Sequence, residues 1–136
     1  MFMDEEMSQS GGKAYAQRTE SMNEFHLAAI ESDRGGFTPL GFTVDADSSV
    51  IQSLQAFRKP FEAYGVSIFR KGYGGVDIYP LKKLGVPLIG FLPDWHRYFK
   101  YHHAATDVFE EVHHRELQLG SATIASLVYM IDRYGL

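Results

Sequence analysis

Short apolar runs alternate with segments of helical pattern along this 136-residue chain, and this alternation constrains its fold more than any other feature. The apolar runs of strand length are residues 25–30, 66–69 and 86–92. The segments with helix signals are residues 11–18, 48–57 and 115–134. Strands that alternate with helices indicate an α/β sheet covered by helices. Polar residues just beyond the strand ends gather at one edge of such a sheet, where sites are commonly built.

Local signals set the expected limits of these elements. Ser8 or Ser10 is expected to cap the first helix. Pro60 is expected to end or kink the second helix near Phe61, because proline lacks an amide donor. The polar and aromatic stretch 93–114 is expected to be a long functional loop. The last helix should bury an apolar stripe of four residues: Ile124, Leu127, Val128 and Ile131.

Composition narrows the class of protein. Hydrophobic residues make up 45% of the chain, which fits one globular domain that buries about two-thirds of its unfolded surface. The net charge of −4 provides no basic surface, so neither nucleic acid nor a membrane is an expected partner. The chain has no cysteine, which excludes disulfides and thiolate metal sites. The acidic N-terminus does not resemble a signal peptide, and the sequence leaves localisation open.

Two carboxylates and one imidazole stand out as candidate metal ligands: Glu6, Asp33 and His103. Borderline divalent cations take oxygen and imidazole nitrogen ligands, and the predicted sheet brings these three places to one edge. Glu5 is then a candidate general base that accepts a proton from metal-bound water. Taken singly, each residue also has a structural explanation; Asp33, for example, can simply close a turn.

The pair His102–His103 with Asp107 is a stronger local signal than any of these residues taken singly. A ligand histidine commonly donates its second ring proton to a neighbouring carboxylate or carbonyl, so His102 and Asp107 are candidate supporting residues. The aromatic residues around this pair suit either a packed loop or the rim of a substrate pocket, and both interpretations stay open. The second pair, His113–His114, is interpreted as a solvated helix entry.

The ordered set of motifs resembles the co-catalytic dizinc exopeptidases of the bacterial leucyl aminopeptidase and plasma glutamate carboxypeptidase type. The resemblance covers essentially all 136 residues. The segments that carry it are residues 4–6 (Asp-Glu-Glu), 11–16, 31–33 (Glu-Ser-Asp), 75–78, 85–87 and 101–107.

This resemblance implies a three-layer αβα fold with a mixed sheet, two zinc ions in the complete site, and hydrolysis of a peptide bond at a free chain end. Asp4 to Glu6 would end an active-site strand, with Glu5 as the base and Glu6 as a ligand. Asp33 would bind the other zinc, and His103 would share a zinc with Glu6. Peptides or aminoacyl compounds are the implied substrates.

Such a site also needs a histidine and a bridging aspartate upstream of the Glu-Glu pair, and only four residues precede Glu5. Residues 1–136 are therefore expected to form one partial, C-terminal zinc-peptidase domain that binds zero or one zinc and is inactive alone. An exposed sheet edge or apolar helix face should then favour a homo-oligomer. The alternatives are a non-catalytic, self-associating interaction module and a one-metal binding protein that uses Glu6, Asp33 and His103.

Overall fold

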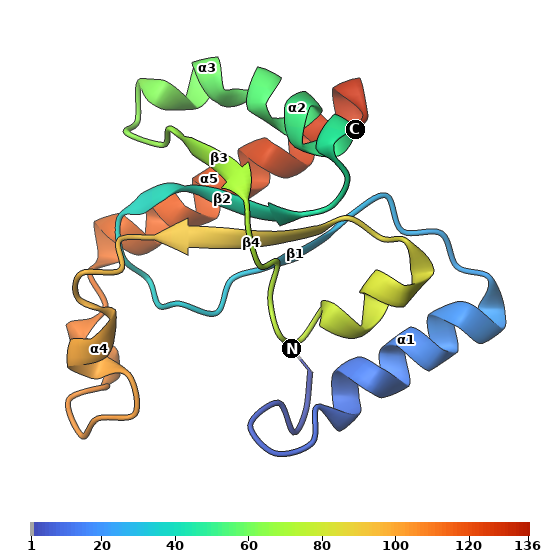
Figure 1. The fold of residues 1–136 in the computed structure, drawn as a ribbon. Coiled ribbons are helices and arrows are strands. Elements are labelled where there is room, and N and C mark those ends of the chain that lie inside the picture. The colour runs from blue at the N-terminus through green and yellow to red at the C-terminus, as the bar shows by residue number, and fades with distance from the viewer. Residues whose placement is uncertain (1) are drawn as a thin grey trace.

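The computed structural model describes residues 2–136 and contains a four-stranded sheet with helices on both faces (Figure 1). The strands are β1 (Ala29–Glu31), β2 (Pro39–Asp45), β3 (Ile68–Lys71) and β4 (Leu88–Pro93). Their order is β1-β4-β2-β3. β1 runs parallel to β4, β4 antiparallel to β2, and β2 parallel to β3. The prediction of an α/β fold with a mixed sheet is confirmed.

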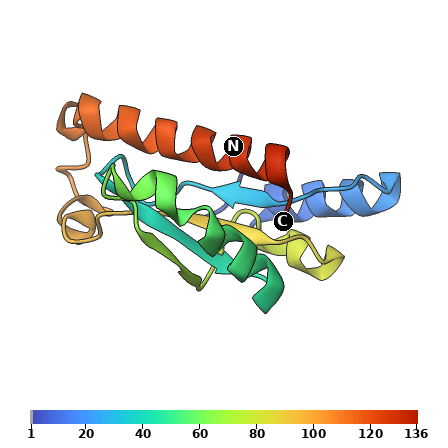
Figure 2. The same ribbon diagram turned by 90° about the horizontal axis from the view of Figure 1, so that it is seen from above.

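The helices form a layer on each face of the sheet, which makes three layers (Figure 2). One layer holds α1 (Ser10–Met22) and the 3-10 helix η1 (Tyr79–Leu84). The other holds α2 (Ser48–Ala56), α3 (Arg58–Glu62) and α5 (His114–Tyr134). Two short helices lie between β4 and α5: α4 (Tyr98–Tyr101) and η2 (Phe109–Glu111). None of the helices described in residues 2–136 has the length and apolarity to cross a membrane.

Each face of the sheet has its own apolar core, because successive residues of a strand point to opposite faces. Ile89 packs in the core beneath α2, α3 and α5, whereas the preceding Leu88 packs beneath α1 and η1. The larger core is centred on Phe42, which is fully buried between the rings of Phe69 and Phe91 at centroid distances of 5.5 and 5.9 Å. Edge-to-face and tilted ring pairs of this kind add stability beyond the area they bury.

The central strand β2 was not predicted from the sequence. It begins at Pro39 and contains Gly41, and both residue types are depleted in strand interiors. The structure resolves the conflict with an irregularity between Pro39 and Gly41. A side chain at Gly41 would lie 1.9 Å from the Ile68 carbonyl oxygen, and its φ of 154° suits glycine. Glycine thus permits the close pairing of β2 with β3.

The predicted helices form, but their ends differ from the expected ones. α1 begins after Gln9, and the hydroxyls of Ser8 and Ser10 donate to the Asp4 carboxylate instead of capping the helix. The second helix breaks at Phe57, four residues before the break predicted near Phe61, and Pro60 is tolerated in the first turn of α3.

Two predicted apolar faces are also smaller than expected. The run 25–30 becomes strand only from Ala29, and Phe25 is 87% exposed. On α5, Leu127 and Ile131 are buried as predicted, but Val128 is 50% exposed. The buried face instead includes Gly120 and Thr123, so the helix is rotated relative to the predicted stripe.

Candidate functional site

Five of the six candidate residues line one cavity of about 250 Å³. They come from three separate segments: the turn before α1, the residues after β1, and the loop between α4 and η2. The five are Glu6, Asp33, His102, His103 and Asp107. The sixth, Glu5, is half-buried and adjacent in sequence to Glu6. The structure thus brings together residues that are about 100 positions apart in the sequence, near one end of the sheet.

A tight turn presents Glu5 and Glu6, where the sequence predicted the end of a strand. Asp4 organises this turn, with a left-handed φ of 64° and a backbone carbonyl that accepts the amide of Gln9 at 2.7 Å. Its carboxylate accepts the hydroxyls of Ser8 and Ser10, which lowers the pKa of Asp4. No separate role for Asp4 is predicted from the sequence, although an Asp with two serines close by is a typical signal for such a turn.

Glu6 and His103 approach each other across the cavity. Glu6 Oε1 lies 3.6 Å from His103 Nε2. His103 has a left-handed backbone with φ of 54°, a conformation that costs energy in a non-glycine residue and often occurs at functional sites. Its neighbour His102 stacks on the Tyr98 ring at 4.6 Å and contacts the His103 ring edge-on at 4.1 Å. These ring contacts support the His103 imidazole, which faces Glu6.

Two carboxylates at the site, those of Glu5 and Asp33, have a raised pKa. Desolvation, followed by the charges of Glu6 and Asp33, raises the pKa of Glu5. Desolvation and the Asp77 carboxylate raise the pKa of Asp33, while Arg34 opposes that rise. A carboxylate with a raised pKa is a better proton acceptor near neutral pH, and a cluster of negative charge attracts cations. The arrangement therefore suits proton transfer beside a cation.

The donor set has the chemistry of a zinc site, but its geometry is incomplete. Two carboxylates and one imidazole are ordinary zinc ligands. Within residues 2–136, no three His, Asp or Glu side chains converge closely enough to hold a metal ion. Of these three side chains, only Glu6 and His103 lie within ion-pair distance of each other, while Asp33 lines the same cavity. The residues thus fit zinc in type, and one ligand pair is in place.

An ion pair that the sequence did not reveal fixes the histidine loop to α5. The Arg97 guanidinium donates to both carboxylate oxygens of Glu116, at 2.7 and 2.6 Å, and Thr38 donates to the same carboxylate. Arg97 also lies 4.7 Å from the centroid of the Phe37 ring, which lines the cavity. A cation over an aromatic face is attracted by the ring. The loop that carries His102 and His103 is therefore anchored at its start.

The Arg97–Glu116 pair makes stability depend on pH. Hydrogen bonds from Arg97 and Thr38 outweigh the effect of desolvation and lower the pKa of Glu116 from 4.5. The unfolded chain therefore binds a proton at Glu116 more readily than the folded chain does. The contribution of Glu116 to the free energy of unfolding is present above pH 4.5 and is lost as the pH falls below that value. Glu116→Gln should remove about 1 kcal/mol at pH 7 and much less near pH 3. Urea unfolding of both proteins at both pH values measures this difference, and an equal loss at the two pH values would contradict it.

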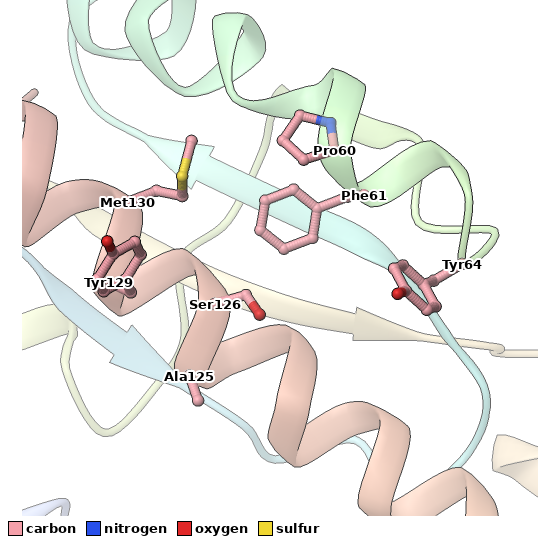
Figure 3. A pocket seen from close by; sticks show the side chains of 7 residues that line it. All are labelled: Pro60, Phe61, Tyr64, Ala125, Ser126, Tyr129 and Met130. Atoms are coloured by element: carbon pink, nitrogen blue, oxygen red, sulfur yellow. The ribbon is translucent and has the colours of Figure 1, made fainter.

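A larger and mostly apolar cavity lies elsewhere, between α3 and α5 (Figure 3). It measures about 490 Å³ and is lined by Pro60, Phe61, Tyr64, Ala125, Ser126, Tyr129 and Met130. None of these lining residues is a carboxylate or a histidine. The smaller cavity with the acids and imidazoles is therefore the better candidate for catalysis.

One similar solved structure connects this arrangement with a known class of protein. It is the crystal structure of a Peptidase M28 precursor from Shewanella amazonensis SB2B, with 28% sequence identity and a TM-score of 0.84. The chain is similar to part of a Peptidase M28 protein. The match covers 96% of this chain but only 30% of that structure's chain. No family model and no curated protein matches the chain.

Proposed function

We propose that this chain is the part of a zinc metallo-exopeptidase domain that carries the base and three metal ligands, and that the complete domain cleaves N-terminal peptide bonds. The observation that carries the proposal is the meeting of Glu6, Asp33 and His103 at one cavity. The similarity in fold and sequence to a Peptidase M28 structure supports it. Peptides or aminoacyl compounds are the proposed substrates, and the acidic cavity suits their free ammonium group.

Each residue has a distinct proposed role. Glu6, Asp33 and His103 would hold zinc, which supplies Lewis acidity and a water molecule of lowered pKa when bound. Glu5 accepts the proton of the attacking water and delivers it to the leaving amine, a task for which its raised pKa is suited. His102 orients His103 through their edge-on contact, and Asp107 adds negative charge to the wall of the cavity.

The 136-residue chain alone is proposed to bind no more than one zinc and to lack turnover. Catalytic zinc sites use three protein ligands, and of the three proposed ligands only Glu6 and His103 lie within ion-pair distance of each other. Isothermal titration with zinc and an assay with leucyl p-nitroanilide test this directly. Binding of one zinc that His103→Ala abolishes supports the proposed ligand set. Two bound zincs with turnover would refute the proposed inactivity, and zinc binding unaffected by His103→Ala would refute the ligand set.

The alternative of a non-catalytic, self-associating module is favoured by one surface. β1 is an edge strand of the described sheet, and α5 lies beside it (Figure 2). Leu117 and Val128, about three turns apart on α5, are 45% and 50% exposed, and Ile124 between them is half-buried. Leu117 lies close to Gly36, in the segment that follows β1. An open strand edge beside an apolar stripe is a template for pairing with a second copy.

Self-association through this surface has a sharp test. Val128→Lys should weaken any dimer at least about tenfold, because it places a charge in the apolar stripe. Sedimentation equilibrium measures the dissociation constant. The matched control is Tyr129→Lys, the next residue on the same helix, which lines the cavity facing α3 (Figure 3). Equal weakening by both variants, or a wild-type protein that remains monomeric at high concentration, would exclude this surface.

A further inference from the structure

The Glu31 carboxylate holds a loop that crosses the sheet by three hydrogen bonds, which together are named the Glu31 clasp. It lies at the end of β1 and accepts three backbone amides from the segment before η1. Oε1 accepts the amide of Val76 at 2.8 Å, and Oε2 accepts those of Asp77 and Ile78 at 2.8 and 3.1 Å. Hydrogen bonds to a charged acceptor are about twice as strong as neutral ones. One half-buried side chain therefore satisfies three consecutive donors that lie 45 to 47 residues away in sequence.

The sequence of the loop is adapted to this clasp. A side chain at Gly75, where φ is 148°, would lie 2.3 to 2.5 Å from the Glu31 carboxyl group. A side chain at Gly74 would lie 2.3 Å from that of Leu88, so the loop rests directly on β4. Both positions therefore require glycine for close backbone approach. A second clasp holds the same loop, because the Thr43 hydroxyl donates to the Tyr73 carbonyl at 2.7 Å.

The clasp also adjoins the candidate site. Glu31 precedes the candidate ligand Asp33 by two residues, and both line a cavity of about 210 Å³. This second cavity shares Asp33 and Tyr98 with the one that holds His103. Its wall includes Gly74, Gly75 and Val76, which are the loop residues next to the clasp. A displacement of the clasp would therefore move the wall of this cavity and the backbone that carries Asp33.

A carboxylate is the only ordinary side chain of this length that suits the position. Its two oxygens offer about four acceptor sites and no donor. Glutamine would offer one oxygen and an amide group, whose hydrogens would face backbone N–H donors. At least one of the three amides would then lose its partner, and leaving a buried donor unsatisfied is destabilising.

We propose that Glu31 is a positioning residue, which joins the loop of residues 73–78 to the end of β1 and thereby holds Asp33 at the site. This inference rests on the proposed function, because Asp33 is a ligand only there. Glu31 does not touch the substrate in this role and acts through Asp33 and the wall of the second cavity. The clasp thus links one edge of the sheet to the metal ligand that follows it.

The test compares Glu31→Gln with Thr43→Val, which loosens the same loop from the other clasp. Zinc titration should give at least about tenfold weaker binding for Glu31→Gln, and binding within about twofold of wild type for Thr43→Val. Gly75→Ala, which pushes against the same carboxylate, should weaken zinc as Glu31→Gln does. Equal zinc affinities in Glu31→Gln and Thr43→Val would overturn the proposal.

A second measurement on the metal-free protein separates this inference from the proposed function. Backbone NMR order parameters of Ser32 and Asp33 should fall in Glu31→Gln and remain unchanged in Thr43→Val. Unchanged values in both variants would overturn the positioning role, whatever the zinc titration gives. If wild type binds no zinc while the order parameters change as expected, the metal site is wrong and the clasp is upheld.

Discussion

Glu5→Gln is expected to lower kcat by about two to four orders of magnitude in a complete peptidase domain built with this chain. The amide cannot accept the proton that the carboxylate takes from the attacking water. A suitable protein is a chimera in which this chain replaces the matching 30% of the Shewanella amazonensis Peptidase M28 protein. Hydrolysis of leucyl p-nitroanilide measures kcat, and elemental analysis measures bound zinc.

Variants of the same chimera distinguish the loss of a general base from the loss of a metal ligand. Glu5→Gln should leave the zinc content unchanged, whereas Glu6→Gln should lower it, because Glu6 is the carboxylate beside His103. Glu110→Gln is the matched control, since this exposed acid lies on η2, outside the lining of the cavity. A kcat within about tenfold of the parent chimera for Glu5→Gln would reject the role of Glu5 as the base.

Convergence of the candidate residues could be predicted because it follows from topology. The α/β alternation places residues that follow β1 and β4 at one region of the sheet, and Asp33 and His103 both follow such strands. The turn at Glu5 and Glu6 was mistaken for a strand end. Its conformation depends on the Asp4 carboxylate and two serine hydroxyls, which a pattern of apolar residues does not detect.

Contacts between distant residues could not be predicted. Glu31 meets Val76 across 45 residues, and its partners are backbone amides, which carry no sequence signal. The Arg97–Glu116 pair spans a loop whose path the sequence does not specify. Both contacts tie the site to the fold, and each required the geometry of a neighbouring strand or helix to be recognised.

The rotation of α5 shows the limit of periodicity. The spacing of Leu127 and Ile131 correctly predicted a helix with an apolar face. The direction of that face is set by the sheet, because a side chain at Gly120 would lie 3.3 Å from the Phe91 ring. The helix lies close to the Phe91 side chain at this glycine, and Val128 faces away from the core. A sequence pattern gives the period of a helix, whereas the sheet against which the helix packs determines which side of the helix is buried.

Phe42→Ala is expected to lower the free energy of unfolding by about 3–5 kcal/mol, a large share of the total stability of a domain this size. Phe42 is fully buried in β2, and its removal leaves a cavity between Phe69 and Phe91. Urea unfolding followed by circular dichroism measures the loss. The matched control is Val128→Ala, which should cost less than about 0.5 kcal/mol because this side chain is half exposed.

The comparison of the two variants decides between the sequence pattern and the structure. The pattern placed Val128 in a buried stripe and assigned no strand to Phe42. A core centred on β2 requires a larger loss of unfolding free energy for Phe42→Ala than for Val128→Ala. The reason is that the cost of a substitution rises with the apolar area and the cavity volume that it removes from or leaves in the core. A larger loss for Val128→Ala than for Phe42→Ala would mean that α5 packs by its predicted face, and that β2 does not form the centre of the sheet.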